Sequence, residues 1–393
     1  MRSWLVPVHY LIVPTESPAG SLRAPRSDVT GPAPELIWPD SLIQPQRPPA
    51  LIYLDLNHWI GIAKANVGRA TGGGYMALLD AARTAKREAA AVFVLSDSLF
   101  IEMSNIADPR QRRDLADVME ELTSFTIMLS RPSVTRLELQ AAIEGIVGPG
   151  PERYAPLDLL STRLAHGFGK RGNLLIKDSE GNDVTMNLRA EMGAEKFDAM
   201  MAAMERDANR MLLRGPQDDE LDDLRLRGYK PEAHRQVTQN RLDQELELVA
   251  ILNREPKNWR KGRLRDVVGG RELVIELNDM IVMALMPRGL SVDNLVEGDR
   301  AKIRSFARCM PGCEVAIELK TQYHRDPSKR WMVNDIYDID ALAVAVPYCD
   351  AVFTDAAARS ILVKAGFEGR MKTALPRTPD ELVGILAALP RSR

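Results

Sequence analysis

Two short apolar runs with a helical pattern between them mark the first ordered part of the chain. The run ALIYL at 50–54 is followed by Asp55, and the run AVFVL occupies 91–95. Both are short and rich in strand-forming residues, which is typical of buried strands. Helix formers fill 75–90, and an amphipathic helical pattern covers 114–129. This part is therefore predicted to alternate strands with helices.

The same alternation returns at the end of the chain. A helical stretch, DIDALAVAV, stops at Pro347, and the strand pattern DAVFTD follows at 350–355. A helix that closes at Gly366 comes next, and then a short strand pattern, MKTAL. The final helix starts with Thr378 as N-cap and Pro379 at its first position. Because alternating strands and helices build a parallel sheet, we expect the two parts to form one α/β domain.

Helical patterns dominate between these two parts. Segments rich in Met, Leu, Glu and Arg, such as 190–213 and 239–252, predict a mainly helical insertion. The N-terminal stretch is crowded with Pro, Gly and Ser, which bury little apolar surface, and is predicted to be an arm. The predicted organisation is an arm at 1–49, the first part of the α/β domain at 50–130, the insertion at 131–330 and the second part at 331–393.

The overall charge gives no general attraction to a polyanion. The formal net charge of the 393-residue chain is -2, so nucleic-acid binding would need local basic patches. Three cysteines are too few for a disulfide framework, which favours a cytoplasmic location. Cys309 and Cys313 lack the second pair of ligands that a zinc site needs. No long apolar run occurs, so no membrane span is expected.

Acidic residues stand at the ends of strands and the starts of helices in the α/β parts. Asp55 and Asp355 each end a strand pattern, and the carboxyl ends of parallel strands meet at one edge of a sheet. Glu102 lies early on a predicted helix, and Asp335 and Asp338 lie near one face at the start of another. Each acid alone also fits a helix cap or a solvated side chain. Together they predict a cluster whose repulsion Mg²⁺ or Mn²⁺ would relieve.

Three motifs in these parts resemble those of the PIN and PIN-like nuclease superfamily. LDLNHW contains the strand-ending Asp55 with Asn57 two residues later, and SDSLFIEM carries Glu102. NDIYDIDALAVAVPYCDAVFTD has an Asp at the head of a small-residue helix and a strand that closes in Thr-Asp. The resemblance covers roughly residues 50–130 and 331–393. It implies a three-layer α/β/α sandwich with a central parallel sheet, and divalent-metal hydrolysis of RNA.

The acid set implied by this resemblance has alternatives at two positions. The third acid could be Asp335, Asp338 or Asp340, and Asp350 competes with Asp355 as the fourth. The motif in which Asp heads the helix favours Asp338, with Asp335 in support. The candidate catalytic residues are Asp55, Glu102, Asp338 and Asp355. The candidate ligands of Mg²⁺ or Mn²⁺ are the same four residues together with Asp335.

Two basic patches mix cations with aromatic residues, which suits phosphates and stacked bases. One occupies 253–265 around Trp259, and the other, KTQYHRDPSKRW at 320–331, directly precedes the predicted catalytic helix. Its position makes the second patch the better candidate, and the alternative for both is a solvated basic loop. The candidate substrate-binding residues are Asn57, Lys320, Arg325, Lys329 and Arg330.

These features favour a metal-dependent endoribonuclease, with a toxin-like or defence-linked effector as one form of it. The alternative is a nuclease-dead PIN-like module that binds RNA or a protein through its helical insertion. That insertion is also the candidate surface for a protein partner or an oligomer. Retention of all four acid positions argues against the nuclease-dead alternative. A phosphatase with Asp55 as nucleophile would need an acid at position 57, and Asn57 disfavours it.

Overall fold

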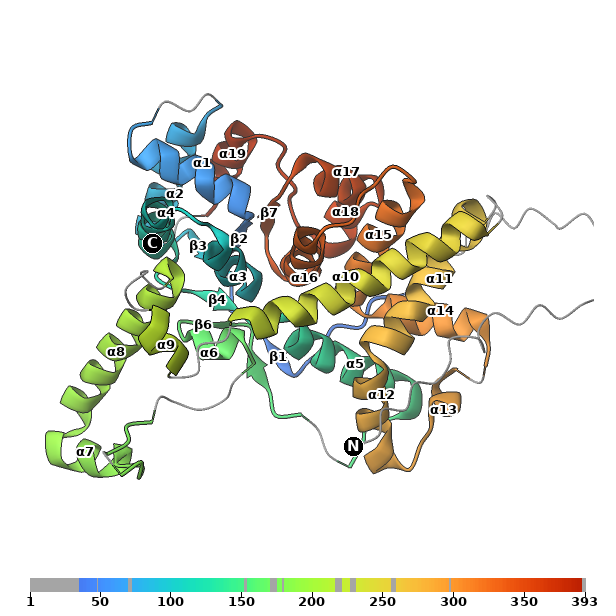
Figure 1. Cartoon of the computed structure of the whole chain (residues 1–393), viewed down its shortest axis with the longest axis horizontal. Helices are drawn as coiled ribbons and strands as arrows, with labels where there is room; N and C mark the ends of the chain where they lie inside the picture. Colours follow the sequence, from blue (N-terminus) through green and yellow to red (C-terminus); the bar gives the residue numbers. More distant parts are fainter. Residues whose placement is uncertain are drawn as a thin grey trace, which may run out of the picture. The chain divides into compact units, whose positions relative to one another are not determined.

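The computed structural model describes most of the chain from residue 35 onward. The described ranges are 35–47, 49–69, 73–151, 154–169, 175–178, 180–215, 221–226, 231–255, 259–296 and 298–390. Residues 1–34, most of the predicted N-terminal arm, lie outside them. The described chain is mainly helical and contains a small parallel sheet (Figure 1). The α/β class is therefore confirmed in its general form.

The parallel sheet joins the two predicted parts of the α/β domain. Its strands are β2 (Ala50–Leu54), β3 (Ala91–Val94) and β7 (Ala351–Phe353), in the spatial order β3, β2, β7. Single parallel bridges extend it on both sides, from Leu95 to Ile127 and from Ala351 to Ala374. Residues far apart in the sequence thus share one sheet, as predicted.

The strand order reverses between β2 and β7. The chain proceeds from β2 through β3 toward one edge of the sheet, and returns at β7 to build the other edge. In open parallel sheets, ligands bind outside the carboxyl ends of the strands at the point where the order reverses. Leu54 pairs with Phe353, so β2 and β7 end at the same level there. Asp55 and Asp355 follow these two strand ends.

Two sets of helices pack around the sheet (Figure 1). In one set, α2 and α4 contact β3, and in the other, α16 contacts β7. The first set consists of α1 (Leu56–Asn66), α2 (Tyr75–Arg87), α4 (Pro109–Thr123) and α19 (Pro379–Ala388). The second consists of α3 (Asp97–Asn105), α5 (Arg131–Val147), α15 (Pro311–Arg325), α16 (Val333–Tyr348), α17 (Ala356–Lys364) and α18 (Phe367–Met371).

Several of these helices begin at capping residues that can be recognised in the sequence. Ser96 Oγ accepts a hydrogen bond from Leu99 N at the start of α3. Thr378 Oγ1 accepts one from Glu381 N at the start of α19, where Pro379 takes the first helical position. An N-cap oxygen satisfies a backbone N–H that the helix itself cannot pair. The predicted start of the last helix is therefore confirmed.

Two predicted helix ends are wrong. The helix expected to run to residue 129 ends at Thr123, because Ser124 and Phe125 adopt positive φ angles of 48° and 59°. Such left-handed backbone ends a right-handed helix. The chain then forms β4 (Ile127–Met128). The helix α16 also continues one residue beyond Pro347, which lies in its last turn.

Helices dominate the described residues of the predicted insertion. None of the helices in the described ranges is long and apolar enough to cross a membrane. The short strands of the insertion pair with strands outside it: β5 pairs with β1 (Leu42–Ile43), and β6 pairs with β4. The elements are β5 (Leu157–Asp158), β6 (Leu160–Ser161), α6 (Leu164–Gly167), α7 (Thr185–Met192), α8 (Ala194–Arg214), α9 (Leu221–Leu226), α10 (Pro231–Arg254), η2 (Trp259–Arg263), α11 (Leu264–Arg271), η3 (Glu272–Glu276), α12 (Asn278–Leu285), η4 (Met286–Arg288), α13 (Val292–Val296) and α14 (Arg300–Cys309).

Two hydrophobic cores meet at α5 and α15. The larger core surrounds the sheet and includes Val315 and Leu319 of α15, whereas the smaller core lies among the insertion helices and includes Ile317. Because α15 contributes to both cores, the insertion is packed firmly onto the second set of helices. Burial in both cores fixes α15, and with it the loop that leads into α16.

Residues 35–47, predicted as part of the arm, are packed against the rest of the chain. Leu42 is buried in the larger core, and Ile37 N donates a hydrogen bond to Cys309 O. The ring of Trp38 contacts that of Tyr348 edge to face. The composition of the whole segment predicted an unpacked arm, but these apolar residues among the prolines make packing contacts.

Candidate functional site

Asp55 lies immediately after β2 and is the N-cap of α1. Its Oδ1 accepts a hydrogen bond from Leu56 N at 2.7 Å, and its Oδ2 accepts one from Thr354 Oγ1 at 3.4 Å. The side chain is buried. Burial raises the pKa of this carboxyl, and the negative charge of Asp355 raises it further. Asp55 is thus a desolvated acid at the carboxyl edge of the sheet.

Asp355 follows β7 and is the N-cap of α17. Its Oδ1 accepts hydrogen bonds from Ala357 N at 2.7 Å and from Ala358 N at 3.1 Å. The side chain is partly exposed. The backbone N–H of Asp355 also favours the charged form of Asp55, so the two residues are in direct contact. Both strand-ending acids therefore act as helix caps at the same place.

Glu102 lies on α3, and α3 packs against α16. Burial raises the pKa of Glu102 to about 9, and the charges of Asp55 and Asp338 contribute to the shift. Among the described residues, Glu102 has no hydrogen-bond or ion-pair partner. A carboxyl in this position stays protonated at neutral pH unless a cation stabilises its charge.

Asp338 lies in the second turn of α16 and completes the set. Burial raises its pKa to about 8, and the charges of Asp55 and Asp355 add to this effect. Like Glu102, it makes no hydrogen bond or ion pair with another residue that the structure describes. These charge effects link Glu102 to Asp55 and Asp338, and they link Asp355 to the same two residues. We call Asp55, Glu102, Asp338 and Asp355 the acid cluster.

The competing acids have other partners. Asp340 accepts hydrogen bonds from Arg131 Nη1 at 2.6 Å and from Arg241 Nη1 at 2.5 Å. Although burial opposes it, the charges of these arginines lower the pKa of Asp340. Asp350 Oδ2 accepts from Leu51 N at 2.9 Å, at the opposite edge of the sheet. Both acids are therefore structural. Among the three proposed third acids, Asp338 is the one whose pKa is raised by the charge of Asp55.

Asp335 uses both carboxylate oxygens within the protein. Its Oδ1 accepts a hydrogen bond from Lys329 Nζ at 2.6 Å, and its Oδ2 accepts one from Met332 N at 2.7 Å. The second bond caps the start of α16. Asp335 is buried, whereas Lys329 is partly exposed. This predicted metal ligand is therefore occupied as the partner of a lysine.

Two tyrosines near the acid cluster were not predicted as site residues. Tyr53 is buried two residues before Asp55 on β2, and burial followed by the charge of Asp55 raises its pKa. Burial, then the charges of Asp355 and Asp338, raise the pKa of Tyr323 on α15. The alternation of side chains along a strand, which puts residues 53 and 55 on one face, could have identified Tyr53.

Asn57 and His58 lie in the first turn of α1. Asn57 is exposed, so its predicted contact with substrate remains sterically open. His58 Nε2 donates a hydrogen bond to Thr354 O at 3.1 Å, which leaves Nδ1 to accept one from Tyr75 OH at 2.9 Å. The imidazole also stacks on Phe353, and burial lowers its pKa. His58 is thus a neutral packing residue.

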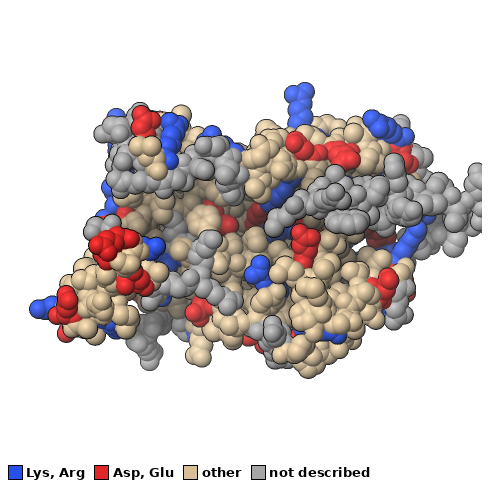
Figure 2. Space-filling view, turned by 60° about the horizontal axis from the view of Figure 1, so that its bottom comes forward, with Lys and Arg blue, Asp and Glu red and all other residues tan. Residues whose placement is uncertain are grey.

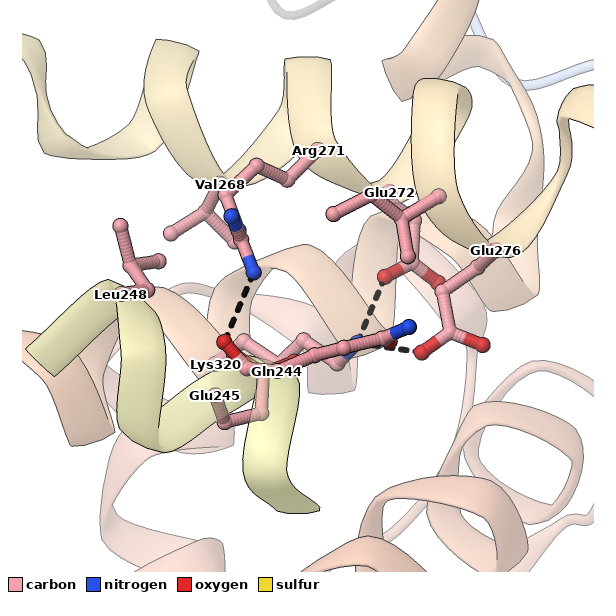
Figure 3. A pocket seen from close by; sticks show the side chains of 9 residues that line it. Gln244, Glu245, Leu248, Val268, Arg271, Glu272, Glu276 and Lys320 are labelled. Atoms are coloured by element: carbon pink, nitrogen blue, oxygen red, sulfur yellow. Dashed lines mark hydrogen bonds and ion pairs between the residues drawn. The ribbon is translucent and has the colours of Figure 1, made fainter. Parts of the chain in front are cut away.

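Lys320, predicted to contact substrate, is buried in the protein interior. Only 4% of it is exposed, and its Nζ lies 2.9 Å from Glu245, 2.8 Å from Glu272 and 3.3 Å from Glu276. Figure 3 shows the ammonium reaching Glu272 and Glu276 across a small cavity. The cavity volume is about 10 Å³, room for about one water. Lys320 is too enclosed to bind a phosphate and belongs to a structural network.

This network links the insertion to the helix that carries Asp338. Arg131 of α5 contacts both Glu272 of η3 and Asp340 of α16. Arg241 of α10 binds both oxygens of Asp340, and contacts Glu276 as well. Four glutamate or aspartate side chains and three cations thereby join α5, α10, η3, α15 and α16. The network holds α16 through Asp340, which lies two residues after Asp338.

The remaining basic candidates lie at the surface. Arg325 and Arg330 are exposed, and Lys329 lies between them in sequence. On the face that Figure 2 shows, acidic and basic side chains are scattered among other residues and form no continuous basic area. Nucleic-acid contact at Arg325, Lys329 and Arg330 stays a prediction, and the net charge of -2 would confine it to such local basic groups.

The acid cluster has the donor chemistry of a hard-cation site, because Mg²⁺ and Mn²⁺ prefer carboxylate oxygens. Across the described ranges, however, no three His, Cys, Asp or Glu side chains meet as ligands of one metal ion. Charges act on one another at longer distances than the contact between a ligand and its ion. The acids can therefore shift each other's pKa although their oxygens do not meet around one ion. Like charges repel without a cation between them. Glu102 and Asp338, which have no competing bonds, are the acids that can turn toward an ion.

Comparison with protein-family models, with curated proteins and with solved structures finds no match for this chain.

Proposed function

We propose that this chain is a metal-dependent endoribonuclease of the PIN-like type, with the acid cluster as its Mg²⁺ or Mn²⁺ site. The observation that carries the proposal is the state of Glu102 and Asp338. Both lie within electrostatic range of Asp55, and neither has a hydrogen-bond or ion-pair partner among the described residues. Desolvated carboxyls without partners ionise only when a cation stabilises their charge, so this arrangement is typical of a site that receives a cation.

The fold supports this proposal in two ways. Asp55 and Asp355 follow the two strands between which the strand order reverses, and this is the usual ligand site of open parallel sheets. The order of Ile127, β3, β2, β7 and Ala374, with a set of helices against each side, agrees with an α/β/α sandwich.

The residues of the acid cluster would divide the chemical work. A bound Mg²⁺ or Mn²⁺ would activate a water and neutralise charge on the phosphodiester. Asp55 and Asp355 are fixed by their caps, so they would hold the ion's position relative to the sheet. Glu102 and Asp338 hold protons at neutral pH, with pKa values of about 9 and about 8. Both would release these protons when the ion binds.

A cleavage assay tests the function. The purified protein should cleave single-stranded RNA only with Mg²⁺ or Mn²⁺, and chelator or Asp338→Asn should abolish cleavage. Asp80→Asn, an exposed Asp on α2, is the matched control and should cleave like the wild type. Undiminished cleavage by a protein that lacks both Asp55 and Asp338 would exclude the acid cluster as the active site.

One observation favours the second candidate, a nuclease-dead module that binds RNA or protein through the insertion. Apolar side chains of α12 and η4 are exposed, including Met283 at 63% and Met286 at 69%. Exposed apolar patches of this kind are found at contacts with a protein partner or a second copy. RNA binding without any cleavage in Mn²⁺ would favour this candidate.

A further inference from the structure

A lysine is built into the loop between α15 and α16, next to the acid cluster. Lys329 Nζ lies 2.6 Å from Asp335 Oδ1 and 4.5 Å from the centre of the Tyr323 ring. Tyr323 in turn packs edge to face on Trp331, with ring centres 5.5 Å apart. A carboxylate and an aromatic face thus hold the ammonium on two sides.

This lysine lies close to the acid cluster. Asp335, which binds its ammonium, stands three residues before Asp338 on α16, so the two carboxylates lie near one face of the helix. The ring beneath the ammonium, Tyr323, is within electrostatic range of Asp355, Asp338 and Asp55. Lys329 keeps 26% of its side chain exposed, so it can still touch a ligand. A lysine ammonium is a common point-charge contact for phosphate.

Both carboxylate oxygens of Asp335 already accept a hydrogen bond, Oδ1 from Lys329 Nζ and Oδ2 from Met332 N at 2.7 Å. The four acids of the acid cluster are therefore the better ligands for an ion. A second divalent ion on the Asp335 side would also have to sit against the ammonium, which like-charge repulsion opposes.

The inference rests on the proposed nuclease function and deepens it. We infer that the site binds a single divalent ion, that Lys329 supplies the second positive charge to the scissile phosphate, and that Asp335 positions this lysine. In the reaction, a water oxygen bonds to phosphorus, and the bond to the leaving oxygen breaks with its electron pair. A proton derived from the water ends on the leaving oxygen, while Lys329 stays protonated throughout.

Mn²⁺ titration and steady-state cleavage of RNA by the full chain test the inference together. The wild type should bind one Mn²⁺. Lys329→Met should keep that ion with a Kd within about threefold of the wild type while kcat falls about 10²-fold, the usual loss when a preorganised charge contact is removed. Asp335→Asn should also keep the ion, because Asn can still accept from Met332 N and cap α16. Its kcat should fall less than that of Lys329→Met.

Two further variants make the result decisive. Asp338→Asn should weaken Mn²⁺ binding at least about tenfold, as expected for a lost ligand. Lys364→Met, at an exposed lysine in the last turn of α17, should match the wild type in both assays. Two Mn²⁺ ions per chain, a loss of Mn²⁺ in Asp335→Asn as large as in Asp338→Asn, or wild-type kcat in Lys329→Met would each overturn the inference alone. A wild-type chain that neither binds Mn²⁺ nor cleaves would remove the proposed function and the inference together.

Discussion

Asp55 and Asp355 follow neighbouring parallel strands, and each is the N-cap of the helix that comes next. In both residues, Oδ1 accepts the capping bonds. The backbone N–H of Asp355 also favours the charged form of Asp55, which places the two acids together. Because a carboxylate has two oxygens, one residue can cap a helix and bind an ion. The cap and the ligand role are therefore separable by substitution.

Asp355→Asn should separate the two roles. Asn caps a helix about as well as Asp, so Asp355→Asn keeps the cap and removes only the charge. Asp355→Ala removes both, so its free energy of unfolding in chelator should be about 1 kcal/mol below that of Asp355→Asn. Both variants should weaken Mn²⁺ binding, since a neutral side chain replaces a carboxylate. Urea unfolding and Mn²⁺ titration measure the two effects.

The N-cap of α4 provides the control for this pair. Asp108 Oδ1 accepts from Arg110 N at 2.9 Å and lies on an exposed helix start. Asp108→Asn and Asp108→Ala should show the same stability difference and no change in Mn²⁺ affinity. Wild-type Mn²⁺ binding by Asp355→Asn would leave Asp355 as a cap only.

The stability of the protein in chelator should fall as pH rises. Glu102 has a folded-state pKa of about 9 against an ordinary value of 4.5, so the folded state binds more protons between these values. Unfolding then becomes easier with rising pH, by up to about 1.4 kcal/mol per pH unit for one such group. Glu102→Gln should flatten this slope. Urea unfolding between about pH 6 and 8 measures it, and equal slopes for both proteins would contradict the burial of an unpaired Glu102.

The sequence predicts the local elements of this site well, because their signals are local. The apolar residues at 50–54 predict a buried strand, and Asp55 follows it directly. Asp355 is recognisable in the same way. The alternation of strands and helices also predicts that these strands share one parallel sheet.

The choice among Asp335, Asp338 and Asp340 depends on residues far away in the sequence. Asp340 accepts hydrogen bonds from Arg131 and Arg241, which lie on two other helices. Lys320 shows the same limit: its sequence neighbours suggest a basic surface patch, yet its three glutamate partners lie on α10 and η3. No local pattern encodes such pairings, since they arise only when the helices pack.

Lys320→Met should destabilise the fold rather than weaken substrate binding. Removing one partner of a buried ion network leaves uncompensated charges, which costs about 3–5 kcal/mol. The salt dependence of RNA binding by the folded variant should stay unchanged, because Lys320 is enclosed. Urea unfolding and binding at several salt concentrations measure both. A stable variant with a flatter salt dependence would return Lys320 to the substrate surface.

Arg325 and Arg330 should contribute to RNA binding through phosphates. Replacing both with Ala should weaken binding and reduce the slope of log K against log salt by about 1.4, since each phosphate contact to a single strand contributes about 0.7. Arg87→Ala with Arg110→Ala, an exposed pair on α2 and α4, is the matched control. An unchanged slope in the Arg325 and Arg330 variant would mark these residues as solvated surface.

The repulsion within the acid cluster provides a test that needs no substrate. Carboxylates about 4 Å apart at an effective dielectric near 20 repel by up to roughly 4 kcal/mol, and relaxation and proton uptake reduce this to about 1 kcal/mol. Asp338→Asn removes one of these charges. It should therefore melt higher than the wild type in chelator, and the difference should grow as pH rises from the ordinary pKa of 3.8 to about 8, the pKa of folded Asp338, and level off above it.

Mn²⁺ should reverse the order of thermal stability, so that the wild type melts higher than Asp338→Asn. An ion that binds only the folded state stabilises it by RT ln(1 + [Mn²⁺]/Kd), or about 2.7 kcal/mol at a hundredfold excess over Kd. The wild type has all four acids and should gain this stability, whereas Asp338→Asn binds the ion more weakly and should gain less. Asp80→Asn, exposed on α2, controls for a general effect of lost charge and should follow the wild type. Thermal melts of the three proteins, with chelator and with Mn²⁺, measure both signs. If Asp338 were an ordinary helix residue, Mn²⁺ would shift the wild type and Asp338→Asn equally, and that result would remove Asp338 from the site.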